Sequence, residues 1–181
     1  MTKRLFDLFF SILGLIISGS FIVLFSILAA LDTKQYGFFT QIRIGQFGKP
    51  FRIYKLRTYG LSSEKPITKF GAFLRNSKID ELPQLWNILI GDMSFVGPRP
   101  DIPGYYDTLE GENRKILQLK PGLTSSASIK YANEDALLDQ QQNPLIYNDT
   151  LLFPDKVKMN LEYYYNHSFI GDLKIIWQTI F

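Results

Sequence analysis

A run of 27 residues from Leu5 to Leu31 is almost entirely apolar, and it limits what the chain can fold into more than any other feature. Asp7 is the only charged residue in the run. About 20 apolar residues cross the hydrocarbon core of a bilayer, so the run is long enough to cross with tilt. A cleaved signal peptide has a shorter apolar core and a small-residue cleavage site, which is missing before Lys34. The run therefore predicts a membrane helix, with residues 1–33 as a separate domain.

Positive charge lies on both sides of this apolar run. Lys3 and Arg4 precede it, and Lys34 follows it. Because positive flanks stay on the cytoplasmic side, both ends are satisfied only if the helix enters and leaves the membrane on the same face. Ser18 and Gly19 lie in the middle of the run, where a helix could bend. A re-entrant helix and a spanning anchor both remain open from the sequence alone.

The remaining residues, 34–181, have the composition of a folded, water-soluble domain. The whole chain is 46% hydrophobic and 20% charged, which excludes both a disordered chain and a typical polytopic membrane protein. The absence of cysteine excludes a disulfide scaffold, a thiol nucleophile and a cysteine-based metal site. The single histidine, His167, excludes a histidine-rich metal centre, and we interpret it as a loop residue. Any catalysis would therefore depend on carboxylates, Lys or Arg, and a hard cation.

Hydrophobic spacing predicts a mixed fold, classed as α/β and mostly helical in an α+β arrangement. Two short strands are expected within Gln41–Tyr59, around a turn at Gly45–Pro50. Apolar residues at helical spacing follow Asp80 and stop at Gly91, which predicts a helix. Further helices are expected over residues 68–76, 110–119, 156–166 and 169–181, with an extended segment at 97–100 and a partly irregular segment at 132–148.

The charge is unevenly distributed along this domain. Residues 43–78 contain nine Lys or Arg and one acid, whereas residues from Asp80 onward contain fourteen acids and eight bases. A basic segment with interleaved aromatic residues is also typical of a membrane-tethered protein that binds anionic lipid or nucleic acid. That alternative has no recognised nucleic-acid motif here, and it gives no reason for the adjacent carboxylates of Asp80 and Glu81.

The Asp80-Glu81 pair is the best candidate for chemistry. Acids are common at helix starts for reasons of capping and the helix dipole, so position alone does not decide the matter. Arg99, however, lies between two prolines, which reduces the backbone freedom it would lose on binding a phosphate. One carboxylate of such a pair can act as nucleophile or metal ligand while the other transfers a proton. Carboxylate and phosphate oxygens together are the usual ligands of Mg²⁺.

Long blocks of the chain resemble the bacterial sugar transferase family, the monotopic polyprenyl-phosphate phosphoglycosyl transferases. The most specific block is DELPQLWN at residues 80–87, followed by VGPRP at residues 96–100. Further matching blocks are KRLFD (3–7), Gln41-x-Arg43-x-Gly45, GKPFRIYKLRT (48–58), KPGLT (120–124) and YYYNHSFIGDLKII (163–176).

The resemblance implies an enzyme of the bacterial inner membrane with its catalytic domain on the cytoplasmic face. Such enzymes transfer a sugar-1-phosphate from a UDP-sugar to undecaprenyl phosphate and release UMP, and no nucleic acid is involved. By resemblance, Asp80 is the nucleophile and contacts Mg²⁺, and Glu81 is its partner. The resemblance also makes Ser18 and Gly19 the membrane bend. The residues implied in holding phosphate are Lys55, Arg57, Arg75 and Arg99.

The chain departs from the pattern of the family at several positions. The membrane bend usually contains Ser-Pro, but Ser18-Gly19-Ser20 contains no proline. After KPGLT the family commonly continues Gly-x-x-Gln, whereas this chain has Ser125–Ser128. An acid often present in the tail helix is replaced by Asn160. We therefore expect the reaction class to be that of the family, while the sugar is not identified.

Overall fold

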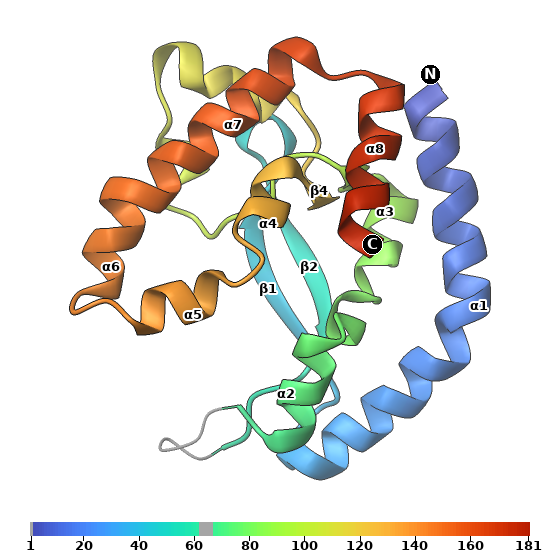
Figure 1. Cartoon of the computed structure of the whole chain (residues 1–181). Helices are drawn as coiled ribbons and strands as arrows, with labels where there is room; N and C mark the ends of the chain where they lie inside the picture. The colour runs from blue at the N-terminus through green and yellow to red at the C-terminus, as the bar shows by residue number, and fades with distance from the viewer. Residues whose placement is uncertain (1, 62–66) are drawn as a thin grey trace. The chain divides into compact units, whose positions relative to one another are not determined.

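The computed structural model describes residues 2–61 and 67–181, and these form two compact units. The first unit comprises Met1–Arg43 and Phe51–Met93, and the second comprises Ile44–Pro50 and Ser94–Phe181. Lys65, which belongs to the predicted basic segment, lies outside the described residues. The fold is mixed and rich in helix, as predicted (Figure 1).

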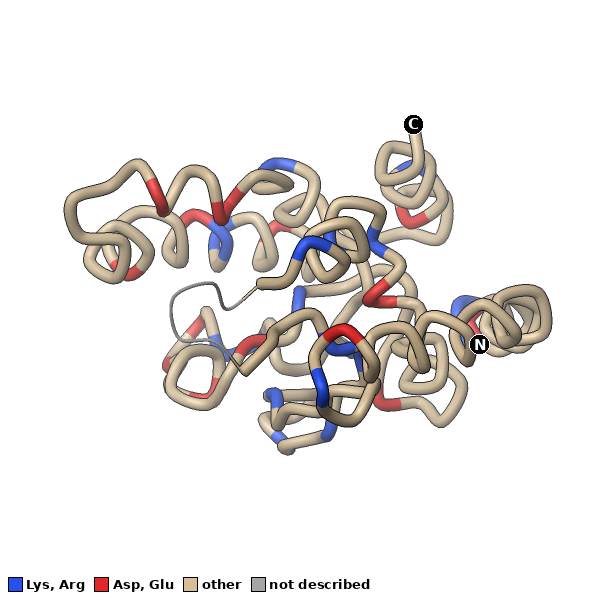
Figure 2. The backbone as a smooth tube through the Cα atoms, turned by 90° about the horizontal axis from the view of Figure 1, so that it is seen from below, with Lys and Arg blue, Asp and Glu red and all other residues tan. Residues whose placement is uncertain are grey.

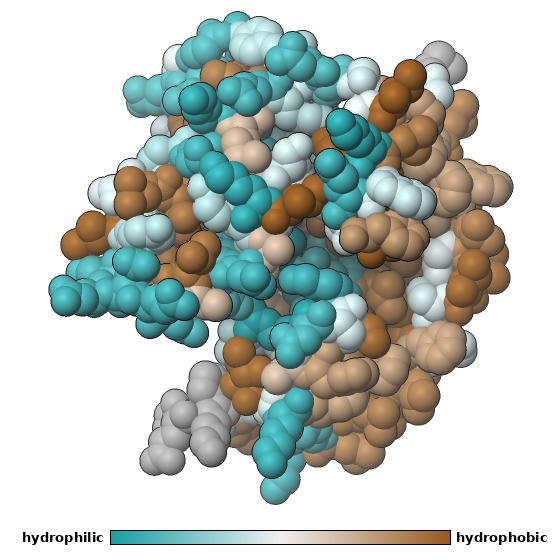
Figure 3. All heavy atoms as spheres, viewed as in Figure 1, coloured by the Kyte–Doolittle hydropathy of each residue, from teal (hydrophilic) through white to brown (hydrophobic). Residues whose placement is uncertain are grey.

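The first unit begins with α1, a continuous helix of 32 residues over Thr2–Thr33. Among the described residues, it is the one helix long and apolar enough to cross a membrane. Only 11% of its most apolar stretch is buried, which is unlike the core helix of a water-soluble protein. Large apolar side chains such as Ile16 and Leu31 point outward and form an apolar surface over α1 (Figure 3). Charged residues lie only near the two ends of the helix (Figure 2).

The buried face of α1 is small and mostly polar. Asp7, Ser11, Ser26 and Thr33 are buried there, together with two apolar residues, Ile22 and Ala29. The Ser11 and Thr33 hydroxyls donate to carbonyls of the preceding turn, so these polar groups need no other partner. This pattern is the reverse of a surface helix in water, where the apolar face is the buried one. The outward face of α1 is suited to lipid.

The predicted bend at Ser18 and Gly19 does not interrupt α1. The Ser18 hydroxyl donates to the Gly14 carbonyl at 2.6 Å, a back-bond that typically bends a helix gently. The helix accordingly curves along its length, and it contacts α2 (Lys69–Asn76) and α3 (Gln84–Ile90) (Figure 1). The same-face membrane arrangement stays a prediction.

Two strands lie between α1 and α2 in the sequence. The predicted strands are confirmed as β1 (Phe38–Ile44) and β2 (Pro50–Leu56), which pair in a two-stranded sheet. They are joined through a 3-10 turn, η1 (Gln46–Gly48). A cluster of buried apolar residues holds α1, β2 and α2 together, and its members are Ile22, Ala29, Leu56 and Leu74.

The predicted helix from Asp80 is wrong in its first turns. Ile79–Glu81 form a 3-10 turn, η2, and the α-helix starts only at Gln84. Pro83 precedes the helix because its nitrogen has no hydrogen to donate, so the regular bonding begins after it. The stop at Gly91 is confirmed, with the left-handed φ of 97° that glycine tolerates.

The second unit contains a parallel strand pair that the sequence did not predict. β3 (Ser94–Val96) pairs with β4 (Gly122–Thr124), with Ser94 opposite Gly122. The two backbones meet so closely that a Cβ on Gly97 would lie 2.2 Å from the Lys120 carbonyl oxygen. Only glycine fits there, because real Cβ contacts are not shorter than about 3 Å. The VGPRP and KPGLT blocks are therefore one structural element.

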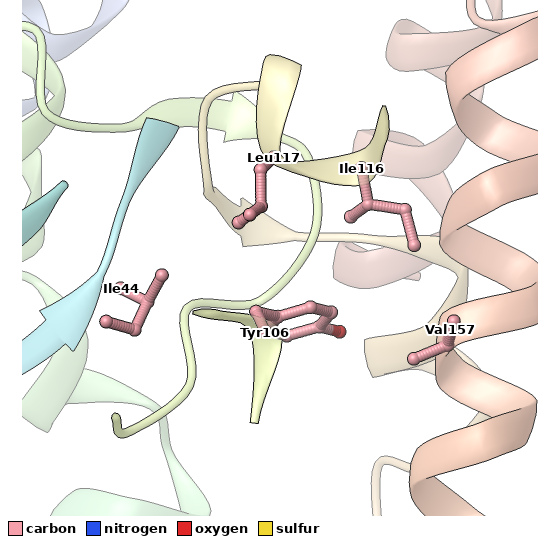
Figure 4. Packing of buried hydrophobic residues seen from close by; sticks show 5 residues of the cluster. All are labelled: Ile44, Tyr106, Ile116, Leu117 and Val157. Carbon is pink, nitrogen blue, oxygen red and sulfur yellow. The ribbon is translucent and has the colours of Figure 1, made fainter. Parts of the chain in front are cut away.

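Helices complete the second unit. The predicted helix over residues 110–119 is a 3-10 helix, η4 (Gly111–Gln118), and the tail helices are confirmed as α7 (Phe153–Asn166) and α8 (Phe169–Ile180). The remaining elements are η3 (Tyr106–Thr108), α4 (Ser126–Lys130), α5 (Glu134–Asp139), α6 (Pro144–Tyr147) and the π-helix η5 (Asn148–Leu152). Their core is the cluster of Ile44, Tyr106, Ile116, Leu117 and Val157 (Figure 4).

Candidate active site

The carboxylates of Asp80 and Glu81 lie in a short turn that is unusual in its backbone. Lys78, which caps the η2 turn, has a φ of 57°, a left-handed conformation that is uncommon for a residue other than glycine. Such strained positions gather at functional sites because the surrounding structure must hold them. The turn places Asp80 inside the first unit, where the residue is 6% exposed.

Asp80 has a carboxylate oxygen that nothing in the described part of the chain satisfies. Its Oδ1 atom is buried and has no hydrogen-bond partner. The Nε2 atom of Gln84, one turn further on, is in the same situation. A buried polar group left unpaired costs about 1–3 kcal/mol, so native proteins keep few of them. An unpaired acceptor here is suited to a ligand, a cation or a reacting atom.

Glu81 is held differently from its neighbour. Lys55, at the end of β2, donates from Nζ to Glu81 Oε1 at 2.7 Å. Both side chains are largely shielded, with 18% and 12% of their side-chain surfaces exposed. The two residues are 26 positions apart in sequence, so the fold creates this ion pair. The pair leaves Glu81 charged and fixed beside the more buried Asp80.

The environment of Asp80 changes its acidity. Burial, and then the neighbouring charge of Glu81, raise the pKa of Asp80 above its ordinary value of 3.8. Lys55, Arg75 and Lys78 act in the opposite direction and favour the carboxylate. Three cations thus converge on one acid from three different elements. This balance is typical of a functional carboxylate, whose charge is tuned rather than simply neutralised.

Arg75 and Arg57 occupy neighbouring but different settings. Arg75 in α2 donates to the Tyr59 hydroxyl at 3.1 Å and lies over that ring. Arg57, just after β2, donates from Nε to the Tyr36 carbonyl at 2.8 Å and lies over the Phe39 ring. The charge of Arg75 also lowers the pKa of Asp80. Arg57 is instead bonded to the segment that follows α1.

Arg99 belongs to the second unit. It follows β3 on the loop that the close glycine contacts hold, and its side chain is exposed. With Gly45, Pro98 and Pro100 it lines a small cavity of about 20 Å³, which is room for about one water molecule. Its predicted role in binding phosphate stays a prediction.

The two departures in the second unit also have structural partners. Asn160, in place of the expected acid, is buried and donates from Nδ2 to the Tyr106 hydroxyl at 2.8 Å. Ser125 caps α4 by accepting from the backbone nitrogen of Ser128 at 3.0 Å. His167 is an exposed residue between α7 and α8, as predicted.

The site residues that sequence reasoning missed are Lys78, Gln84 and Asn87. Gln84 and Asn87 are polar residues inside an apolar helical pattern, and both are buried. A polar residue at a core position of a short helix was the available signal. Lys78 had no comparable signal, because its role depends on a backbone conformation that only the folded turn shows.

The donor set can be tested for Mg²⁺. No group of three or more His, Asp or Glu residues that could hold a metal is present within residues 2–61 and 67–181. Magnesium is commonly bound by one or two carboxylates, with substrate phosphates and water as the other ligands. The unpaired Oδ1 of Asp80 is a suitable donor of this kind. The residues therefore fit a cation that arrives with a phosphorylated substrate.

The chain is similar to several known proteins. The sequence model described as bacterial sugar transferase matches residues 1–181. A Bacillus subtilis protein with a proposed undecaprenyl-phosphate N-acetylgalactosaminyl 1-phosphate transferase function is 43% identical over 121 residues, covering 61% of this chain and 68% of that protein. The uncharacterized sugar transferase EpsL of Bacillus subtilis is 36% identical, covering 98% of this chain and 85% of that protein.

A longer relative also matches along this whole chain. The UDP-glucose:undecaprenyl-phosphate glucose-1-phosphate transferase of Klebsiella pneumoniae is 30% identical, over 99% of this chain but 39% of its own length. The family pattern thus covers the membrane helix, the carboxylate turn and the arginine loop together. This chain belongs to the bacterial sugar transferase family.

Proposed function

We propose that this protein transfers a sugar-1-phosphate from a UDP-sugar to undecaprenyl phosphate and releases UMP, the first membrane step in assembling a glycan. The observation that carries the proposal is the buried Asp80 with its unpaired oxygen, next to Glu81 held by Lys55. The names of the relatives support the donor and acceptor classes. A basic protein that only binds lipid or nucleic acid would have no use for this arrangement.

The first half-reaction uses Asp80 as a nucleophile. A carboxylate oxygen of Asp80 attacks the phosphorus that carries the sugar, and the bond from that phosphorus to the oxygen shared with the UMP phosphate breaks. UMP leaves with that electron pair, and the sugar phosphate remains on Asp80 as an acyl phosphate. Burial makes the carboxylate poorly solvated and raises its pKa, while the three nearby cations act in the opposite direction and favour the ionised form that attacks.

The second half-reaction returns Asp80 to its starting state. A phosphate oxygen of undecaprenyl phosphate attacks the same phosphorus, and the bond to Asp80 breaks to give the lipid diphosphate sugar. If the acceptor phosphate carries a proton, Glu81 takes it, because Glu81 lies beside Asp80 and is held as a carboxylate by Lys55. Lys55 and Arg75 offset negative charge at the transferred phosphoryl group. The phosphate-binding roles of Arg57 and Arg99 rest on the resemblance to the family.

Asp80 would also hold Mg²⁺ together with the substrate phosphates. When bound there, Mg²⁺ supplies charge neutralisation at the phosphoryl group. We therefore expect excess EDTA to abolish transfer and added Mg²⁺ to restore it.

The decisive experiment is intact-mass spectrometry of the protein with UDP-sugars before any lipid acceptor is added. The wild type should gain the mass of one sugar phosphate, and Asp80→Asn should gain none, because an amide does not attack the phosphoryl group. Glu81→Gln should still form the adduct but release it to undecaprenyl phosphate about 10²–10⁴ times more slowly. A panel of UDP-sugars identifies the substrate in the same measurement.

Two results would overturn the mechanism. An adduct that persists in Asp80→Asn would mean that another residue is the nucleophile. Normal UMP release with no adduct in the wild type would favour direct transfer from donor to acceptor.

The site is proposed to face the cytoplasm, with both ends of α1 on that side of the bacterial inner membrane and the turn near Ser18 and Gly19. The chain has no cysteine, so single cysteines at Thr2 and Asn166 can be labelled without background. Neither position should react with an impermeant thiol reagent in intact cells, and both should react after lysis. Labelling of the Asn166 position from outside would show that α1 spans the membrane instead.

A further inference from the structure

The side chain of Asn87, in α3, makes two hydrogen bonds to the backbone of β2, one as acceptor and one as donor. It is fully enclosed, with 0% of its surface exposed. Its Oδ1 atom accepts from the Tyr54 backbone nitrogen at 3.2 Å, and its Nδ2 atom donates to the Arg52 carbonyl at 2.8 Å. A side-chain amide placed this way substitutes for the neighbouring strand that β2 would otherwise need on that edge.

The backbone of Asn87 is equally engaged at the end of its own helix. Its carbonyl accepts from the backbone nitrogens of Gly91, Asp92 and Met93 at 3.1, 2.9 and 3.2 Å. The two carbonyls that follow, of Ile88 and Leu89, accept from the guanidinium of Arg4 at 2.6 and 2.8 Å. The last turn of α3 therefore has little freedom, and its amide side chain is a fixed point for β2.

The residue that follows this contact on β2 is Lys55, and Glu81 lies in the turn that precedes α3. We infer that Asn87 is a positioning residue: its amide holds β2 against α3 so that Lys55 reaches Glu81. The inference rests on the proposed function, because the geometry of the Lys55–Glu81 ion pair matters only if these residues take part in the reaction. Displacing a reacting group by about 1 Å can lower a rate about 10²-fold, so a contact of this kind affects catalysis as well as folding.

A purely structural role for Asn87 predicts a different result. Without the amide, a backbone nitrogen and a backbone carbonyl of β2 lose their partners, so the loss of stability alone would be expected of any buried asparagine with two such bonds. A role through Lys55 adds a specific consequence: once Lys55 is gone, Asn87 has nothing further to position. A double-mutant cycle separates the two roles, because residues that act as one unit are not additive.

The experiment measures adduct formation from a UDP-sugar in single turnovers, using Asn87→Ala, Lys55→Met and the double variant. Asn87→Ala should lower the rate constant about 10- to 100-fold and change the KM for UDP-sugar by less than about threefold. In the Lys55→Met background, the same change should cost less than about twofold. Asn87→Asp is the milder variant, since it keeps the acceptor for the Tyr54 nitrogen and the side-chain size. Circular dichroism and melting confirm that each variant is folded.

Asn160→Ala is the matched control, because it removes a buried amide bond of similar burial from the second unit. Its effects should multiply with those of Lys55→Met. If Asn87→Ala and Asn160→Ala lower the rate constant equally, and both losses multiply with that of Lys55→Met, the inference is overturned and the proposed function stays intact. A wild type that forms no adduct and transfers no sugar phosphate would instead overturn the proposed function itself. If Asn87→Ala does not fold, the cycle is run with Asn87→Asp, and the same two outcomes decide.

Discussion

The two compact units differ in how some of their buried polar side chains are satisfied. In the second unit, the buried side chains of Asn160, Asp172 and Thr124 each bond another side chain, that of Tyr106, Tyr163 and Thr179 respectively. In the first unit, Asp80 and Gln84 are as deeply buried, but each keeps an atom without a hydrogen-bond partner.

The difference indicates that the first unit contains buried polar atoms that lower its stability. Paired polar groups make a core unique without costing stability, whereas unpaired ones are a cost that persists when function needs the group. This contrast fits a second unit that acts as a framework and a first unit that holds the proposed reactive atoms. The following predictions test this division, beginning with the largest effect.

Substituting one buried leucine in each unit tests the two cores directly. Leu74 in the first unit and Leu152 in the second are 0% and 3% exposed, so replacing either with alanine should cost about 2–5 kcal/mol of unfolding free energy. Leu74→Ala should also slow adduct formation, because α2 carries Arg75 and leads into the Lys78 turn. Leu152→Ala should leave the rate per folded molecule unchanged. Similar rate losses in both variants, measured at a temperature where both are folded, would contradict the division.

Lys55→Met tests the ion pair at the carboxylates. Because Lys55 both holds Glu81 and favours the charged form of Asp80, we expect adduct formation to slow at least about 10²-fold. Lys115→Met is the control, since Lys115 also pairs with a glutamate, Glu112, but both side chains are open to solvent. An exposed pair contributes at most about 1 kcal/mol, so this control should react normally. Single-turnover rates of the two variants give the comparison.

Asp80→Asn should make the protein more stable, while Asp172→Asn should make it less stable. Removing a charge that burial disfavours relieves the first unit, and we expect a rise in Tm of about 2–4 °C at pH 7 without divalent cations. Asp172 is buried with the Tyr163 hydroxyl donating to it at 2.5 Å, so its replacement weakens a satisfied pair.

The pH dependence of this gain follows from the raised pKa of Asp80. Because the folded protein holds the proton more tightly than the unfolded chain, Asp80 lowers stability only where the carboxylate is ionised. The advantage of Asp80→Asn should therefore be absent below about pH 3.8, grow as the pH rises, and become constant above the raised pKa. Melting curves across this range measure it, and an advantage that grows as the pH falls would contradict it.

The sequence by itself determined those features that depend on local composition or on a long contiguous motif. The long apolar helix follows from 27 apolar residues, and the β1–β2 pair follows from two short strand patterns around a glycine-rich turn. The pair at Asp80 and Glu81 was recognised from DELPQLWN, because all of its residues lie together in the chain. Such features need no knowledge of distant contacts.

Only the tertiary structure decided how these features work together. Lys55 reaches Glu81 across 26 positions, and Asn87 reaches Arg52 across 35, distances over which helical or strand periodicity carries no information. The parallel pairing of β3 with β4 was missed because each strand has three residues, too few to show an alternating pattern. Above all, the acidity of Asp80 depends on burial and on three cations from separate elements, and burial is a property of the packed chain alone.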